Sequence, residues 1–209
     1  MIGITARGPL LTVAAATSLL ISVRLASAQS NTLYLTDRER GGEISIVQNG
    51  QVIAKNAQTP TNGNALAVAR HVRTVGFLPT SSGSEYNLVT GAAVGWPHFC
   101  TPNVCCFYDG TTDGSRYNYT VTHNESAVVY RTDRDWPNPT IVFSLAMQSL
   151  GITYDLANNS LWLGSWRGDV AVYQYSLTGT SLSSFSLAGT EFTSARVGSL
   201  AYNPVDQTL

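Results

Sequence analysis

The sequence has few charged residues and almost no lysine. Charged residues make up 12% of its 209 positions. Twelve residues are basic and thirteen are acidic, which gives a net charge of −1, and Lys55 is the only lysine. A surface that binds nucleic acid needs clustered lysine and arginine to neutralise phosphates. No such cluster occurs, so we expect no binding to nucleic acid. Heptad repeats, collagen triplets and long blocks of like charge are also missing, which excludes the fibrous classes.

Short enzyme motifs are missing as well. The sequence contains no G-x-S-x-G, no H-E-x-x-H and no phosphate-binding P-loop. Its three histidines, His71, His98 and His123, are scattered and have no nucleophile motif beside them. A catalytic triad can be assembled from distant residues, but nothing in the sequence nominates one. We therefore favour a non-enzymatic protein and expect no cofactor.

The first 28 residues are typical of a secretory signal peptide. Arg7 precedes an apolar run over residues 9–23, and Ala26-Ser27-Ala28 supplies an A-x-A cleavage site. A membrane-spanning helix would need about 20 apolar residues, and Arg24 interrupts this run first. We therefore predict cleavage after Ala28, a mature chain without a membrane span, and a secreted or cell-surface location.

The rest of the chain favours an all-β domain. The full sequence is too hydrophobic, at 44%, for a disordered protein, and its length fits one domain. Short runs of β-branched and aromatic residues alternate with turn signals, as in all-β proteins. Asn64–Val72 is the one segment with a pattern that predicts a helix, and 74–77 is predicted to be a strand.

An internal repeat gives the fold class. Residues 152–161 match residues 200–209 at a spacing of 48, and residues 31–36 match residues 159–164. A weaker copy contains Tyr117–Val121, Ala127–Tyr130 and Ile141–Phe143. A repeat of this length with about four strands has the size of a β-propeller blade. We therefore predict an all-β, β-propeller-like fold with four-stranded blades and a period of about 48 residues.

The strands of one blade can be placed from this repeat. We predict an inner strand at Gly151–Tyr154, followed by strands at Leu161–Ser165, Val170–Tyr175 and Leu182–Ser186. The mature chain opens on the second strand of a blade. Either Leu200–Tyr202 closes a four-bladed ring, or further blades follow in a longer protein. We favour the second because the last repeat stops in mid-pattern, so residues 29–209 are predicted to be an incomplete propeller-like domain.

Several of these stretches resemble exported bacterial proteins that carry a PEP-CTERM sorting tail. The stretches are residues 108–114, 117–119, 129–136, 151–155, 158–163 and 175–179. The resemblance covers most of Thr32–Leu209 and implies a secreted propeller-like domain bound for the cell surface or extracellular matrix. It implies no assigned activity. The sorting tail itself is absent from this chain.

Three cysteines lie close together in one loop. Cys100, Cys105 and Cys106 follow His98, which suggests either a metal site, a disulfide or simple packing. Structural zinc sites normally use C-x2-4-C pairs separated by a spacer, and an exported protein more naturally forms a disulfide. We favour a disulfide from Cys100 to Cys105 or Cys106, with one thiol left over.

Several acidic residues suggest an alternative function, a metal-dependent hydrolase. Asp133 and Asp135, or Asp155 and Asn203 at equivalent repeat positions, could contribute to a divalent metal site in the central channel, as in propeller hydrolases of the gluconolactonase kind. An Asp or Asn before a turn more often accepts local backbone N–H groups, and we favour that role. Asn118, Asn124 and Asn158 begin formal glycosylation sequons, which we interpret as chance occurrences in a bacterial protein.

The favoured function is a non-catalytic, exported binding or matrix module. Its binding surface would be a face of the ring formed by inter-strand loops, because such loops sit on a rigid scaffold. Exposed Trp96, Trp136 and Trp166 would suit carbohydrate, so the expected partners are extracellular polysaccharide or other surface proteins. The alternatives are the metal-dependent hydrolase or lactonase and a purely structural protein.

Overall fold

The computed structural model describes residues 32–37, 43–56, 63–69, 71–76, 82–88, 90–95, 98–99, 104, 106–122, 126–167, 169–190, 196–203 and 207–209. These residues form strands, turns and irregular segments and contain no helix, hence none that could cross a membrane. The predicted all-β class is confirmed. The signal peptide predicted for residues 1–28 lies outside the described residues.

The strands form four antiparallel sheets, here called blades 1 to 4. Blade 1 consists of β1 (Thr32–Asp37), β2 (Glu43–Gln48) and β3 (Gln51–Asn56). Blade 2 consists of β4 (Gly63–Val68), β5 (His71–Gly76) and β7 (Glu85–Asn87). Blade 3 consists of β9 (Phe107–Thr112), β10 (Tyr117–Thr122), β11 (Ala127–Asp133) and β12 (Thr140–Leu145). Blade 4 consists of β13 (Ser149–Asp155), β14 (Ser160–Ser165), β15 (Ala171–Ser176) and β16 (Ser181–Ser186). Two short strands, β6 (Ser82–Gly83) and β8 (His98–Phe99), pair separately.

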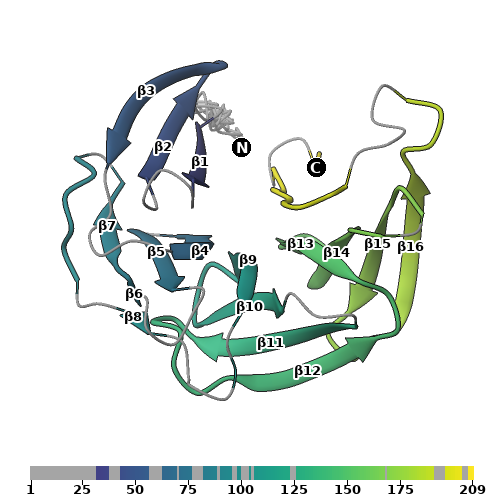
Figure 1. Cartoon of the computed structure of the whole chain (residues 1–209). Helices are drawn as coiled ribbons and strands as arrows, with labels where there is room; N and C mark the ends of the chain where they lie inside the picture. Colours follow the sequence, from purple (N-terminus) through teal and green to yellow (C-terminus); the bar gives the residue numbers. More distant parts are fainter. Residues whose placement is uncertain are drawn as a thin grey trace, which may run out of the picture.

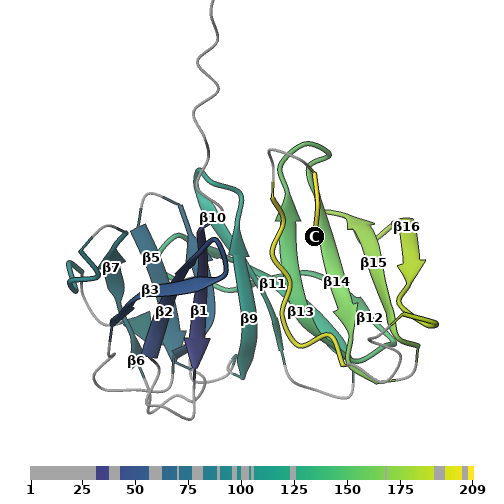
Figure 2. The same ribbon diagram turned by 90° about the horizontal axis from the view of Figure 1, so that it is seen from above.

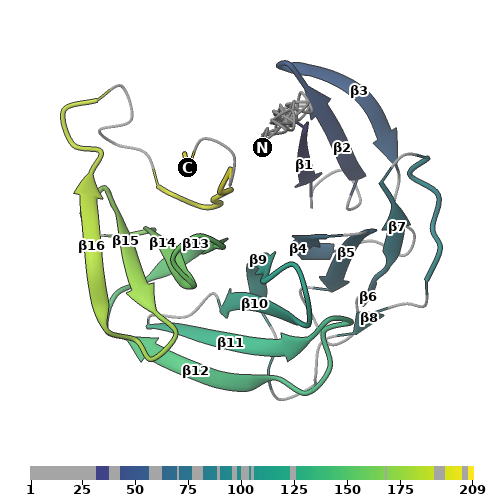
Figure 3. The same cartoon turned by 180° about the vertical axis from the view of Figure 1, so that it is seen from behind.

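The blades are arranged radially, as in a β-propeller. Figure 1 shows β1, β4, β9 and β13 innermost, and Figure 3 shows the same arrangement from behind. The sheets do not close into a ring, because a gap separates blade 1 from the C-terminal segment, defined here as Arg196–Asn203. Figure 2 shows that this segment runs beside β13 on blade 4. The predicted incomplete propeller is confirmed.

The apolar core is divided among the three junctions between neighbouring blades. A blade is apolar on both faces and can bury them only against its neighbours. Ile44, Val72 and Tyr86 fill the junction of blades 1 and 2, and Phe107 and Trp136 lie with small residues at the junction of blades 2 and 3. The largest cluster joins blades 3 and 4 through Tyr119, Val121, Val129, Phe143, Ile152, Tyr154, Leu161, Leu163 and Tyr175.

The strands predicted for one blade agree with β13 to β16, and those of the weaker copy agree with β10 to β12. The helix predicted at Asn64–Val72 is wrong. Residues 64–68 belong to β4 and residues 71–72 to the start of β5, and Ala65 and Ala67 are buried on one face with half-buried Leu66 between them. Pairing of β4 with β5, together with the packing of β4 beside β9, outweighs the local helix propensity of the three alanines at positions 65, 67 and 69.

Candidate functional site

The loop after β11, residues 134–139, lies at the junction of blades 2 and 3. Trp136 is fully buried there, and its ring centroid is 6.4 Å from that of Phe107. A Cβ atom added to Gly110 would lie 2.7 Å from Cη2 of Trp136, so this close approach requires glycine. The prediction that Trp136 is exposed for carbohydrate contact is therefore wrong. The indole instead anchors the loop to the core.

The loop is also closed by hydrogen bonds around Asp133. The backbone N–H of Asp133 donates to the Pro137 carbonyl (3.0 Å), and the N–H of Trp136 donates to the Asp133 carbonyl (2.9 Å). The Asn138 amide donates to Oδ2 of Asp133 (2.9 Å). Trp136 and Asn138 both have positive φ, at 70° and 54°, a conformation that persists only where the surroundings hold it. The loop is therefore held in one shape.

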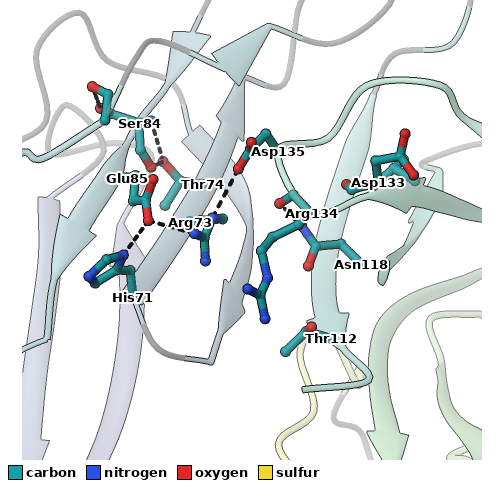
Figure 4. Close-up of polar contacts among 12 residues, drawn as sticks. His71, Arg73, Thr74, Ser84, Glu85, Thr112, Asn118, Asp133, Arg134 and Asp135 are labelled. Atoms are coloured by element: carbon teal, nitrogen blue, oxygen red, sulfur yellow. Dashed lines mark hydrogen bonds and ion pairs between the residues drawn. The ribbon is translucent and has the colours of Figure 1, made fainter. Parts of the chain in front are cut away.

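A network of charged side chains ties the same loop to blade 2. Figure 4 shows Arg73 of β5 between Glu85 and Asp135. Nε of Arg73 donates to Oδ1 of Asp135 (3.0 Å) and its Nη2 to Oε1 of Glu85, which also contacts Nδ1 of His71. The Arg73 side chain is only 10% exposed. Single charges in short strands carry no motif, so sequence reasoning missed Arg73 and Glu85.

We expect Arg73→Gln to lower the free energy of unfolding by about 2 kcal/mol, because Glu85 and Asp135 lose their shared partner in a partly buried site. Lys55→Gln is the matched control, since Lys55 pairs with Glu43 on the surface and exposed pairs contribute about 0–1 kcal/mol. Urea unfolding of both variants checks this. Equal losses would show that the Arg73 network does not hold the loop.

The residue of this loop whose side chain has unused hydrogen-bond donors is Arg134. Its backbone carbonyl accepts a 2.5 Å hydrogen bond from the amide of buried Asn118, which places the sequon at Asn118 inside the protein. Its Nη2 reaches only the Gly114 carbonyl, at 3.5 Å, and its buried Nε has no partner among the described residues. In Figure 4 the side chain extends away from Asp133 and toward Thr112. The guanidinium therefore has unused donors.

The neighbouring loop, residues 113–116, adds more arginine to this end of the blades. Asp113 accepts hydrogen bonds from the N–H groups of Ser115, Arg116 and Tyr117. Burial raises the pKa of Asp113, but these hydrogen bonds outweigh it and hold the pKa below its ordinary value. Arg116 and Arg131 lie over the Tyr117 ring, at 5.0 and 4.4 Å from its centroid. We call loops 113–116 and 134–139 the arginine face.

A buried carboxylate lies nearer the centre. Asp109 of β9 accepts hydrogen bonds from the N–H groups of Ile152 (2.8 Å), Leu200 (3.1 Å) and Gly110 (2.9 Å). Burial raises the pKa of Asp109 to about 7, although the N–H groups oppose the shift. Because three N–H donors already use this carboxyl group, its evident role is to join β9, β13 and the C-terminal segment.

Asp155 does not contribute to the acidic metal site that the sequence offered as an alternative. This carboxylate accepts hydrogen bonds from the N–H groups of Ala157 and Asn158 and from the indole of Trp162, so the expected turn-capping role is confirmed. Asn203 is the last residue of the C-terminal segment and forms an isolated antiparallel β-bridge with Thr208. Within the described part of the chain, no group of three or more His, Cys, Asp or Glu side chains is placed to hold a metal ion.

The other candidate residues are scattered. Trp166 directly follows β14, which runs antiparallel to β13, so it lies at the end of the blades opposite to the arginine face. Its side chain is half-buried, and its ring centroid is 6.2 Å from that of Tyr108 and 5.1 Å from Cζ of Arg196. Cys106 is half-buried with a free thiol. The disulfide stays a prediction, because Cys100 and Cys105 lie outside the described residues. Three other candidate residues also lie outside them, namely Trp96, His123 and Asn124.

Comparison with known proteins supports the fold. No protein-family model and no curated protein sequence matches the chain. Among solved structures, the chain is similar to a β-propeller in the crystal structure of a nidogen/laminin complex, with a TM-score of 0.56 and 14% identity over 77% of this chain. It also matches the Cps50 (Swd1) β-propeller domain of Myceliophteria thermophila, with a TM-score of 0.47 and 14% identity over 84% of this chain. It spans 62% of the length of each. The radial blades and the likeness to the first of these structures therefore show a β-propeller-like fold whose described sheets do not close into a ring.

Proposed function

We propose that this chain is an exported, non-catalytic binding module whose arginine face holds an acidic side chain of a partner protein. The signal-peptide pattern of residues 1–28 and the resemblance to tailed surface proteins support export to the cell surface or matrix. The resemblance to a propeller from a nidogen/laminin complex supports a protein as partner, because that propeller was crystallised in a complex between proteins.

The observation that carries the proposal is the state of Arg134. Its loop is fixed by buried Trp136 and by the Arg73–Asp135 ion pair, so little conformational entropy is lost when a partner binds. Its guanidinium lacks a carboxylate partner among the described residues, whereas Asp133 and Asp135 are held by Asn138 and Arg73. An arginine with unused donors on a rigid loop is suited to a bidentate contact with a carboxylate.

We expect Arg134→Ala to weaken binding of acidic peptides at least about tenfold, since a charge-assisted hydrogen bond contributes about 1.5–3 kcal/mol. Arg134→Lys keeps the charge but not the planar fork and should lose an intermediate amount. The measurement is surface plasmon resonance on the chain from Gln29 onward, with immobilised synthetic peptides centred on Asp or Glu and with an acidic polysaccharide in a parallel channel.

Arg196→Ala is the matched control, because Arg196 lies at the other end of the blades, over the Trp166 ring. It should leave peptide binding unchanged. Equal affinity of wild type and Arg134→Ala for the peptides would contradict the proposal. Binding to the polysaccharide alone would replace the protein partner with a carbohydrate one.

A further inference from the structure

Two arginines of blade 3 lie over one aromatic ring beside the arginine face. The Cζ atoms of Arg116 and Arg131 are 5.0 and 4.4 Å from the centroid of the Tyr117 ring. Arg116 is exposed, and Arg131 is half-buried. A guanidinium that stacks on a ring keeps the N–H groups of its edge for an anion. We call Arg116, Tyr117 and Arg131 the tyrosine subsite.

The pairing of β10 with β11 fixes the tyrosine subsite in place. Tyr119 lies directly opposite Arg131, and Tyr117 is two residues before Tyr119, so the three side chains share one face of the sheet. Tyr119 belongs to the buried cluster between blades 3 and 4, and Tyr117 packs against that cluster. Burial raises the pKa of Tyr119 to about 12, and the charge of Arg131 opposes this shift. The ring and the Arg131 guanidinium are therefore attached to the core.

The arginines of the tyrosine subsite have no anionic partner within the described part of the chain. The ion pairs found there lie in blade 1, in blade 2 and at Asp135, and none of them includes Arg116 or Arg131. The carboxylates of the nearest loops have other partners. Asp113 accepts three N–H groups of its own loop, and Asp133 accepts a side-chain amide. Both guanidiniums therefore keep donors for an anion from another molecule.

The tyrosine subsite adjoins Arg134 through loop 113–116. Nη2 of Arg134 is 3.5 Å from the Gly114 carbonyl, and Arg116 and Tyr117 follow Gly114 in the chain. Gly114 has a φ of 74°, a left-handed conformation that favours glycine and sets the shape of this turn. An extended segment of a partner advances about 3.3 Å per residue. Two acidic side chains a few residues apart can therefore reach Arg134 and the tyrosine subsite together.

We propose that the tyrosine subsite binds a second carboxylate of the same partner segment, so that the partner protein is recognised by two acidic side chains. One of them contacts Arg134, and the other contacts Arg116 and Arg131. The inference rests on the proposed function, because the first contact is the one that Arg134 makes. Once that contact has formed, the second is made within the complex and adds affinity at little further cost in entropy. The tyrosine subsite thereby selects partners with a pair of acidic residues.

The test compares synthetic peptides that contain one aspartate with peptides that contain two, separated by serine spacers of increasing length. Surface plasmon resonance on the chain from Gln29 onward gives the affinities. At the best spacing we expect the peptide with two aspartates to bind at least about tenfold more tightly, because it makes a second charge-assisted contact. Arg131→Gln should bind the peptide with one aspartate as wild type does and should lose this preference. Arg167→Gln, which removes an exposed arginine at the opposite end of the blades, should keep it.

A second pair of variants tests the role of the ring. Tyr117→Phe keeps the aromatic platform and should retain the preference, whereas Tyr117→Leu keeps an apolar side chain without the ring and should lose most of it.

The possible failures can be told apart. If no acidic peptide binds, the proposed function is wrong and this inference falls with it. If peptides with one and two aspartates bind equally at every spacing, the Arg134 contact stands and the tyrosine subsite is overturned. A preference that persists in both Arg131→Gln and Tyr117→Leu would also overturn it, because the second carboxylate would then bind elsewhere.

Discussion

Replacing Trp136 with alanine should lower the free energy of unfolding by about 3–5 kcal/mol, the usual cost of removing a buried tryptophan. The indole is fully buried at the junction of blades 2 and 3 and packs against Phe107 and Gly110. Its loss leaves a cavity that the backbone of two blades surrounds. Chemical denaturation with wild type in parallel measures the effect. Because Trp136 also anchors loop 134–139, peptide binding to the arginine face should fall as well.

Two further variants make this prediction specific. Gly110→Val places side-chain atoms in the space of the indole and should also destabilise the fold, because a Cβ there meets Trp136 at 2.7 Å and Ala65 at 3.2 Å. Leu156→Ala, on an exposed turn, should cost less than about 1 kcal/mol. A Trp136→Ala protein as stable as Leu156→Ala would mean that the two blades do not pack through this residue.

Asp109 should make the protein less stable as the pH rises from about 4 to 7. The pKa of Asp109 is about 7 in the fold, raised by burial from an ordinary 3.8. Between these values the native state holds a proton that the unfolded state has released, so raising the pH favours unfolding. A difference of about three pKa units corresponds to about 4 kcal/mol over this range.

Asp109→Asn separates this effect from all other titrations. The amide is neutral and its oxygen can still accept the N–H of Ile152, so the variant should lack this pH dependence and should be the more stable protein above about pH 7. The measurement is the difference in unfolding free energy between the two proteins across the pH range. Asp113→Asn should behave in the opposite way, because the pKa of Asp113 is lowered, so its contribution is present above its ordinary pKa and is lost in acid. An unchanged slope in Asp109→Asn would contradict the assignment.

The blade strands could be predicted because their signal is local and repeated. The match of Tyr154 with Tyr202 at a spacing of 48 residues indicated a blade, and alternation within residues 160–186 indicated its strands. The helix prediction at Asn64–Val72 failed because its alanines have no strong β preference. The strand conformation there depends on pairing with β5 and on packing beside β9, and a pattern within the segment cannot show this.

The candidate site could not be predicted in the same way. Trp136 has the sequence context of an exposed turn, between Asp135 and Pro137, and only the three-dimensional packing of blades 2 and 3 shows that it is buried. Arg73 and Glu85 are separated from Asp135 by many residues, and their pairing follows from the neighbourhood of two blades. The loop sequence near Asp133 suggested its carboxylates as metal ligands, as an alternative to the favoured turn-capping role, whereas the structure leaves Arg134 with unused donors.

The most direct test of the arginine face is hydrogen–deuterium exchange of the chain with and without the acidic peptide that binds it most tightly. We predict slower exchange in loops 113–116 and 134–139 on binding, with Trp166 and Arg167 at the opposite end of the blades unchanged. Slower exchange at Trp166, Arg167 and Arg196, with no change at Arg134, would contradict this prediction and would place the binding surface on the Trp166 side.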